Sequence, residues 1–148
     1  MSDLMKANWK NLIFIVLFVV VIGVFTTVHG ERQATSFELE DERFLLHGPE
    51  NYTVTVELAE LASLETRSAF SPGRCLEGVN EGAYQYGTWE NEELGQYALC
   101  KLSKLNTCII MRRLDGSAVV FNFENTQTTE EFGKSFPEYL REQGYEIS

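Results

Sequence analysis

Few residues of this chain have the types and spacing that catalysis or metal binding requires. The two histidines, His29 and His47, lie in polar stretches and lack the helical His-x-x-x-His spacing of a metal site. A serine nucleophile would have to take its base from one of them, and the chain has no Gly-x-Ser-x-Gly elbow. We therefore expect no enzyme activity, no cofactor and no metal site.

Two other polar patterns carry no assignable chemistry. Gly133-Lys134-Ser135 resembles the end of a phosphate-binding loop, but that motif needs a glycine where Thr128 stands and a strand before the loop. Glu92 and Glu93 could in principle do acid-base work, yet neighbouring carboxylates in a sequence usually form a solvated face. We assign neither pattern a role.

The three cysteines, Cys75, Cys100 and Cys108, fit two interpretations. They are too few for a tetrahedral zinc site or a disulfide scaffold. If a hairpin turn is centred near Lys104, Cys100 and Cys108 face each other across two strands, and a disulfide between them is permitted. The alternative is that all three are buried thiols that pack as small apolar groups.

The stretch from Phe70 to Gly82, FSPGRCLEGVNEG, predicts a long loop because it holds three glycines and a proline. Long loops on rigid scaffolds often carry function. Arg74, Leu76, Val79 and Asn80 are therefore the candidate interaction residues.

Most of the remaining body predicts strands, because apolar alternation recurs between turn signals. The candidate strands are 36–39, 43–47, 52–58, 63–68, 82–90, 94–101, 107–113 and 117–123. Asp115-Gly116 predicts a hairpin between the two most apolar strands, TCIIMRR and SAVVFNF. These strands should form the centre of the sheet, with Ile110, Val119 and Phe121 in or near the core.

Aromatic and C-terminal patterns complete the expected domain. Tyr84, Tyr86 and Trp89 are expected to fill the core rather than form an exposed stripe.

After Asn125 the spacing of apolar residues becomes helical, with N-cap hydroxyls at 126–129 and one apolar face. That face comprises Phe132, Phe136, Tyr139 and Leu140. Pro137 predicts a kink or break near Phe136.

Near the N-terminus, residues 12–28 form an uncharged run, LIFIVLFVVVIGVFTTV, long enough to just span a bilayer as a helix. Lys6 and Lys10 precede it, so the positive-inside bias places the N-terminus in the cytoplasm. A cleaved secretory signal ending near Gly30 is the alternative, although the run is longer than a usual signal core.

These patterns divide the chain into five segments. We expect a cytoplasmic tail (1–11), a transmembrane helix (12–28), a linker (29–35), a folded domain (36–142) and a C-terminal tail (143–148). The expected location is the cell membrane, with one span and the domain outside the cytoplasm. Residues 31–148 hold 21 acidic and 10 basic residues, so nucleic-acid binding by the domain is not expected.

The domain resembles the bacterial pleckstrin-homology-like domains of Gram-positive membrane proteins. The resemblance is carried by four features: the strand and polar turn in VTVELAELASLE, the glycine-containing segment from Arg74 to Gly82, the start of the next strand at Gly82-Ala83-Tyr84, and the run LDGSAVVFNFENTQTTEEF. The last joins an Asp-Gly hairpin to a Thr-capped helix.

The resemblance implies a mostly β fold, a partly open barrel of two roughly orthogonal antiparallel sheets with a C-terminal helix at one end. It also implies binding rather than catalysis. Phosphoinositide-binding members of the wider superfamily use a basic early hairpin, but the matching stretch 38–43 is acidic here, so that activity is not expected.

We therefore expect a membrane-anchored, non-catalytic binding or scaffolding module. Its N-terminal helix would contact membrane lipid, and its exported domain would meet a protein or cell-envelope partner. The alternative is a secreted soluble ligand-binding protein released by cleavage near Gly30. The sequence leaves the oligomeric state open.

Overall fold

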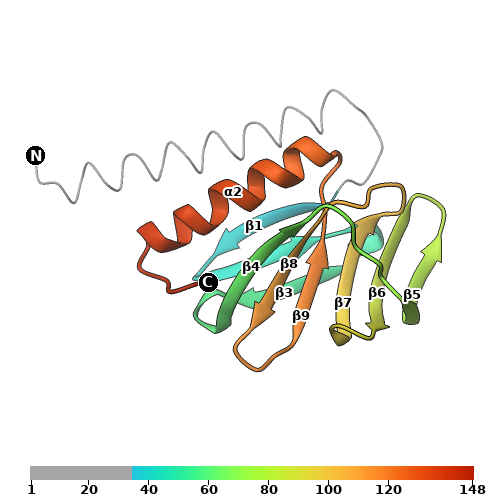
Figure 1. Ribbon diagram of the computed structural model, residues 1–148, viewed down its shortest axis with the longest axis horizontal. Coiled ribbons are helices and arrows are strands. Elements are labelled where there is room, and N and C mark those ends of the chain that lie inside the picture. Colours follow the sequence, from blue (N-terminus) through green and yellow to red (C-terminus); the bar gives the residue numbers. More distant parts are fainter. Residues whose placement is uncertain (1–34) are drawn as a thin grey trace, which may run out of the picture. The chain divides into compact units, whose positions relative to one another are not determined.

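The computed structural model describes residues 35–148, which form a mostly β domain with two sheets and a C-terminal helix (Figure 1). Within this range, no helix has the length and apolar character needed to cross a membrane. The predicted cytoplasmic tail, the transmembrane helix at 12–28 and residues 29–34 of the linker lie outside the described residues. Thr35, the last predicted linker residue, is buried.

The first sheet is an antiparallel meander of three short strands: β1 (Ser36–Glu40), β2 (Arg43–His47) and β3 (Thr53–Glu57). Asp41 and Glu42 join β1 to β2 and both have positive φ, +49° and +61°, as tight two-residue hairpins require. The short 3-10 helix η1 (Pro49–Asn51) joins β2 to β3. The early hairpin is thus formed, and its tip is acidic.

The second sheet has six strands in the order β4-β8-β9-β7-β6-β5. They are β4 (Leu61–Arg67), β5 (Arg74–Glu81), β6 (Tyr84–Asn91), β7 (Gly95–Leu102), β8 (Cys108–Arg113) and β9 (Ala118–Phe121). The 3-10 helix η2 (Leu58–Glu60) leads into β4. The predicted Asp-Gly hairpin is confirmed, because β8 and β9 pair antiparallel around Asp115-Gly116 and lie inside the sheet.

The sheets differ in one respect from the antiparallel pair that was expected. β9 lies between β8 and β7, and it runs parallel to β7, with Leu99 opposite Val120. The second sheet is therefore mixed, and neither sheet closes into a barrel among the described residues. A mostly β domain of two sheets with a C-terminal helix is what the structure confirms.

The helix α2 (Thr126–Glu142) begins with a side-chain cap and continues through its proline. Asn125, not the predicted threonine hydroxyls, caps it by accepting a hydrogen bond from the Thr128 N–H at 2.8 Å. Of the predicted kink or break near Phe136, the break is wrong, because one helix runs through Pro137 to Glu142. Phe136, Pro137 and Leu140 are all buried, so packing on both sides of the proline holds the last turns in place.

Both faces of the central strands are buried, which explains why TCIIMRR and SAVVFNF lack alternation. On one face, Phe121 packs against Phe44 of the first sheet and Phe132 of α2, with ring centroids 5.6 Å apart in each pair. A second apolar cluster occupies the opposite face; it comprises Phe70, Trp89, Tyr97, Leu99, Cys108, Ile110, Ala118 and Val120. Ile110, Val119 and Phe121 are fully buried, as predicted.

The helix lies close to the sheet at one glycine. A Cβ atom on Gly133 would be 1.8 Å from the Thr66 hydroxyl oxygen and 3.1 Å from the Ile109 Cδ1 atom. The glycine of the Gly133-Lys134-Ser135 tripeptide therefore lets α2 approach β4 and β8. In this structure the tripeptide lies inside a helix and does not follow a strand and loop.

Candidate functional site

All four predicted interaction residues lie in one strand, β5, rather than in a loop. Arg74, Leu76, Val79 and Asn80 belong to the span Arg74–Glu81, which pairs antiparallel with β6 along its whole length. The predicted loop is therefore wrong from Arg74 onward, and only the connection 68–73 before it is irregular.

The glycines that suggested a loop instead permit the strand pairing. Gly78 lies opposite Gly87 of β6, and both have positive φ, +129° and +118°. A Cβ on Gly78 would be 2.2 Å from the Tyr86 carbonyl oxygen, and one on Gly87 would be 2.2 Å from the Glu77 carbonyl oxygen. Two glycines are needed because the backbones of β5 and β6 approach too closely here for any side chain.

β5 is the exposed edge of the six-stranded sheet. Among the described residues its only paired strand is β6, and six of its eight residues are exposed while the other two are half-buried. The opposite edge, β4, is partly covered, because the Ser148 N–H donates to the Ala62 carbonyl at 3.1 Å. The backbone donors and acceptors of an uncovered edge strand can pair with an added strand.

The side chains of β5 combine charge with one exposed apolar group. The register shifts between Cys75 and Glu77, so Leu76 is the extra residue of a bulge, and this residue is 40% exposed. Arg74 is ion-paired with Glu90 of β6 at 2.7 Å, and its side chain is 75% exposed. Bulges and charges of this kind limit indiscriminate pairing at a sheet edge, so an added strand has to match them.

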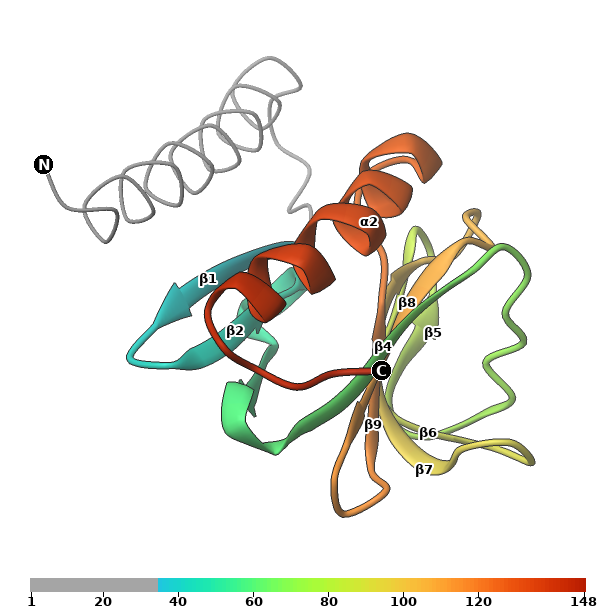
Figure 2. The same ribbon diagram turned by 60° about the vertical axis from the view of Figure 1, so that its left-hand side comes forward.

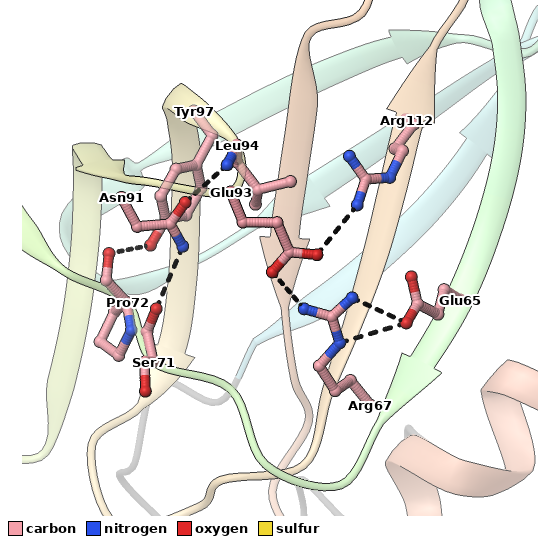
Figure 3. Close-up of polar contacts among 9 residues, drawn as sticks. All are labelled: Glu65, Arg67, Ser71, Pro72, Asn91, Glu93, Leu94, Tyr97 and Arg112. Carbon is pink, nitrogen blue, oxygen red and sulfur yellow. Dashed lines mark hydrogen bonds and ion pairs between the residues drawn. The ribbon is translucent and has the colours of Figure 1, made fainter.

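The connection that leads into β5 is fixed to the sheet by hydrogen bonds (Figure 3). The Tyr97 hydroxyl donates to the Pro72 carbonyl at 2.5 Å, and the Asn91 side-chain amide donates to the Ser71 carbonyl at 3.1 Å. Burial raises the pKa of Tyr97, so its hydroxyl stays protonated as a donor. Phe70 is buried edge-on to the Tyr97 ring. The connection bows outward between β4 and β5 (Figure 2), and the Phe70 N–H donates to the Asn106 carbonyl at 3.2 Å.

Glu93, in the β6–β7 turn, lies between two arginines from the other end of the sheet (Figure 3). It is ion-paired with Arg67 of β4 and, at 3.3 Å, with Arg112 of β8. Arg67 also binds Glu65 at 2.9 Å. The hydrogen bond from Arg67 holds the pKa of Glu93 below its ordinary value. These contacts across the sheet show that it is strongly curled, since β4 and β6 are not neighbours.

No local pattern in the sequence indicates this ion-pair cluster. Glu93 and its neighbour Glu92 look alike in the sequence, and only the curl of the sheet distinguishes them. Lys101 has no sequence signal either: it is 2% exposed and donates to the Gln85 side chain and the Ser103 carbonyl. Burial lowers the pKa of Lys101. The sequence of its strand, β7, carries no pattern that predicts a buried ammonium group.

Cys100 and Cys108 do not face each other across a hairpin. Their strands, β7 and β8, are separated by β9, and both cysteines are free. The hairpin on which the possible disulfide depended is therefore absent from residues 35–148. Burial raises the pKa of Cys100 and of Cys108 to about 11 each. Cys75 is also free, but it is only half-buried.

The other groups considered for chemistry are dispersed. His47 contacts Glu38 and Thr53 at the surface of the first sheet. Across residues 35–148, no group of three or more His, Cys, Asp or Glu side chains is placed to hold a metal ion. Tyr86 and Trp89 are buried, whereas Tyr84 is half-buried. The exposed strand β5, with its anchored connection, is therefore the candidate functional site.

Comparisons of this chain with protein-family models, with curated proteins and with solved structures found no match. The assignment of the site consequently rests on the geometry of β5 and its surroundings.

Proposed function

We propose that this chain is a membrane-tethered, non-catalytic binding module whose exported domain takes an extended segment of a protein or cell-envelope partner along β5. The observation that carries the proposal is the edge position of β5, with six exposed residues in a strand of eight. Backbone hydrogen bonds along such an edge supply affinity, and the alternating side chains supply specificity.

The anchored connection favours this use of β5. The hydrogen bonds of Ser71 and Pro72 hold the strand's entry, and β6 holds its whole length. A strand that is already extended and fixed loses little conformational freedom when a partner pairs with it. The bulge at Leu76 would add a local apolar contact.

The proposed partner is neither a phosphoinositide nor a nucleic acid. The β1–β2 hairpin tip carries Glu40, Asp41 and Glu42, and the one adjacent cation, Arg43, lies 3.9 Å from Asp41. Such a tip repels phosphate groups. Contact with membrane lipid is assigned to the predicted N-terminal helix alone.

Site-specific photo-crosslinking in intact cells tests the binding site. A benzophenone amino acid at position 76 is expected to form an adduct with the partner. The same group at position 114 is the matched control, because Leu114 is the other large exposed apolar residue of the described domain (35–148) and lies in the β8–β9 turn. Equal adducts at both positions, or none at position 76, would contradict the assignment of β5.

Membrane fractionation tests the tether and the topology. Full-length protein should stay in alkaline-washed membranes, and protease added outside intact cells should cleave its C-terminal domain. A soluble species beginning near Glu31 would instead indicate a cleaved signal and a secreted ligand-binding protein. The intact mass of the purified chain separates these two results.

A further inference from the structure

The side chains of β5 are divided between the two faces of the sheet in an order that the bulge determines. Residues directly opposite each other in an antiparallel pair share a face. Cys75, Gly78 and Asn80 lie opposite Trp89, Gly87 and Gln85, and therefore share one face. The shift at Leu76 moves Arg74 to the other face, which it shares with Glu77, Val79 and Glu81.

This order is self-complementary over the whole strand in one antiparallel register. With Gly78 opposite Gly78 of a second copy and Leu76 again the extra residue, Arg74 lies opposite Glu81. The same register sets Cys75 opposite Asn80 and Glu77 opposite Val79. Each pair then shares a face, and the two-fold symmetry generates two Arg–Glu pairs, one at each end of the paired strands.

The neighbouring registers are unfavourable. Centring the two-fold axis on Val79 sets Glu77 opposite Glu81 twice, and centring it on Glu77 sets two copies of that carboxylate against each other. Like charges directly opposite destabilise a strand pair. Arg74 is the only basic residue of β5, and its side chain is 75% exposed. A register centred on Cys75 would set Arg74 opposite Glu77, but it pairs only residues 74–77 of β5. The Gly78-centred register pairs the whole strand and gives Arg74 an acidic partner across the interface without opposing two carboxylates.

We propose that the strand received by β5 is β5 of a second copy of this chain, so that two six-stranded sheets become continuous. This inference rests on the proposed use of β5 as an acceptor edge. Strand addition buries a small area, so the dimer should be weak in dilute solution. Tethering both copies to one membrane raises their effective concentration and favours pairing there.

Cysteine crosslinking tests the register in the full-length membrane-bound protein. In Asn80→Cys, the new thiol would lie opposite the native Cys75 of the second copy, and mild oxidation should give a dimer that a reducing agent reverses. Within one strand these two positions are roughly 15 Å apart, too far for a disulfide in the same chain. Val79→Cys is the register control, because residue 79 lies on the other face from Cys75.

Charge reversal tests the two Arg–Glu pairs. Arg74→Glu should lower the dimer yield roughly tenfold, because it replaces two attractive pairs by two repulsive ones. Arg74→Glu combined with Glu81→Arg should restore the yield. Arg141→Glu makes the same change of charge on an exposed residue of α2 and should leave the yield unchanged.

A reversible dimer of Asn80→Cys, its absence in Val79→Cys and recovery in the charge swap would support the proposal. Equal dimer from both cysteine variants would overturn the register. No dimer from Asn80→Cys, with photo-adducts of another protein still formed at position 76, would overturn pairing between copies while leaving β5 as an acceptor. Loss of both signals would reject both proposals. Thermal unfolding of each variant checks that the domain is folded.

Discussion

Gly78 of β5 and Gly87 of β6 lie directly opposite each other, and each fills the space that the other's side chain would need. At this point the candidate binding strand β5 pairs with β6 through two residues that have no side chains. Any side chain here would meet a backbone carbonyl oxygen of the neighbouring strand, which cannot rotate away.

Gly87→Ala should therefore destabilise the domain by at least about 2 kcal/mol, because a close contact is added to an unfavourable positive φ. Urea unfolding measures the change. Gly82→Ala is the control: its φ is also positive, but a Cβ there has open space around it. Hydrogen exchange should show faster opening of β5 in Gly87→Ala. Equal losses in the two variants would mean that strain of φ, not close approach, determines the effect.

Glu93→Gln should lower the free energy of unfolding at pH 7 by about 1 kcal/mol or less, since the ion pairs with Arg67 and Arg112 are partly exposed and solvent-screened. The pKa of Glu93 is lowered in the folded state. Its contribution is therefore complete above the unfolded pKa of about 4.3 and is lost as pH falls through the folded pKa.

Urea unfolding between pH 7 and pH 2.5 tests this dependence, with Glu92→Gln as the matched control on the adjacent exposed residue. The difference between wild type and Glu93→Gln should shrink below about pH 4 and also in high salt. A difference that persists at pH 2.5 would show that the substitution acts through packing and not through charge.

Thiol labelling of the native protein at pH 8 should modify one cysteine per chain quickly. Cys75 is half-buried on the edge strand, whereas burial raises the pKa of Cys100 and Cys108 to about 11. At that pKa roughly one thiol in a thousand is ionised at pH 8, and the thiolate is the reactive form. Cys75→Ser should abolish the fast phase, and denaturant should expose all three thiols in the wild type. Rapid labelling of two or three native thiols would contradict the buried placement.

Gly133→Ala should destabilise the domain by about 1–3 kcal/mol, although alanine is the better helix former by about 1 kcal/mol. The new Cβ would overlap the Thr66 hydroxyl, whose β-branched side chain has few alternative rotamers. Thr66→Ala should be tolerated far better, and Thr66→Ala with Gly133→Ala should recover most of the stability. Chemical denaturation of the wild type, the two single variants and the double variant gives the coupling free energy between positions 66 and 133. Additive effects would show that this contact does not limit the approach of α2.

Local patterns predicted the apolar centre of the fold well. Alternation and turn residues located eight of the strands, and the Asp-Gly turn identified the β8–β9 hairpin because that signal is complete within a few residues. Phe132, Phe136 and Leu140 marked the buried face of α2, since helical spacing depends only on nearby positions. Such features need no knowledge of the rest of the chain.

The errors came from features that depend on distant residues. β5 resembled a loop because Gly78 becomes a strand residue only when Gly87 is opposite it. Cys100 and Cys108 resembled a facing pair because no local signal shows that β9 enters between their strands. Pro137 suggested a break because the packing that holds α2 together comes from the sheets. The four candidate residues thus lie together in one element, but that element is a strand and not the predicted loop.

The insertion of β9 between β8 and β7 also has a consequence for how the chain is made. Until residues 118–121 have been synthesised, β4 and β8 share no hydrogen-bonded neighbour with β5, β6 and β7. The six-stranded sheet then exists as two fragments, β4 with β8 and β5 with β6 and β7. The apolar faces of both fragments lack β9, the strand that joins them. A chain that ends or stalls before Phe121 should behave as an aggregation-prone intermediate, and completion of one four-residue strand should convert it into a cooperative folding unit.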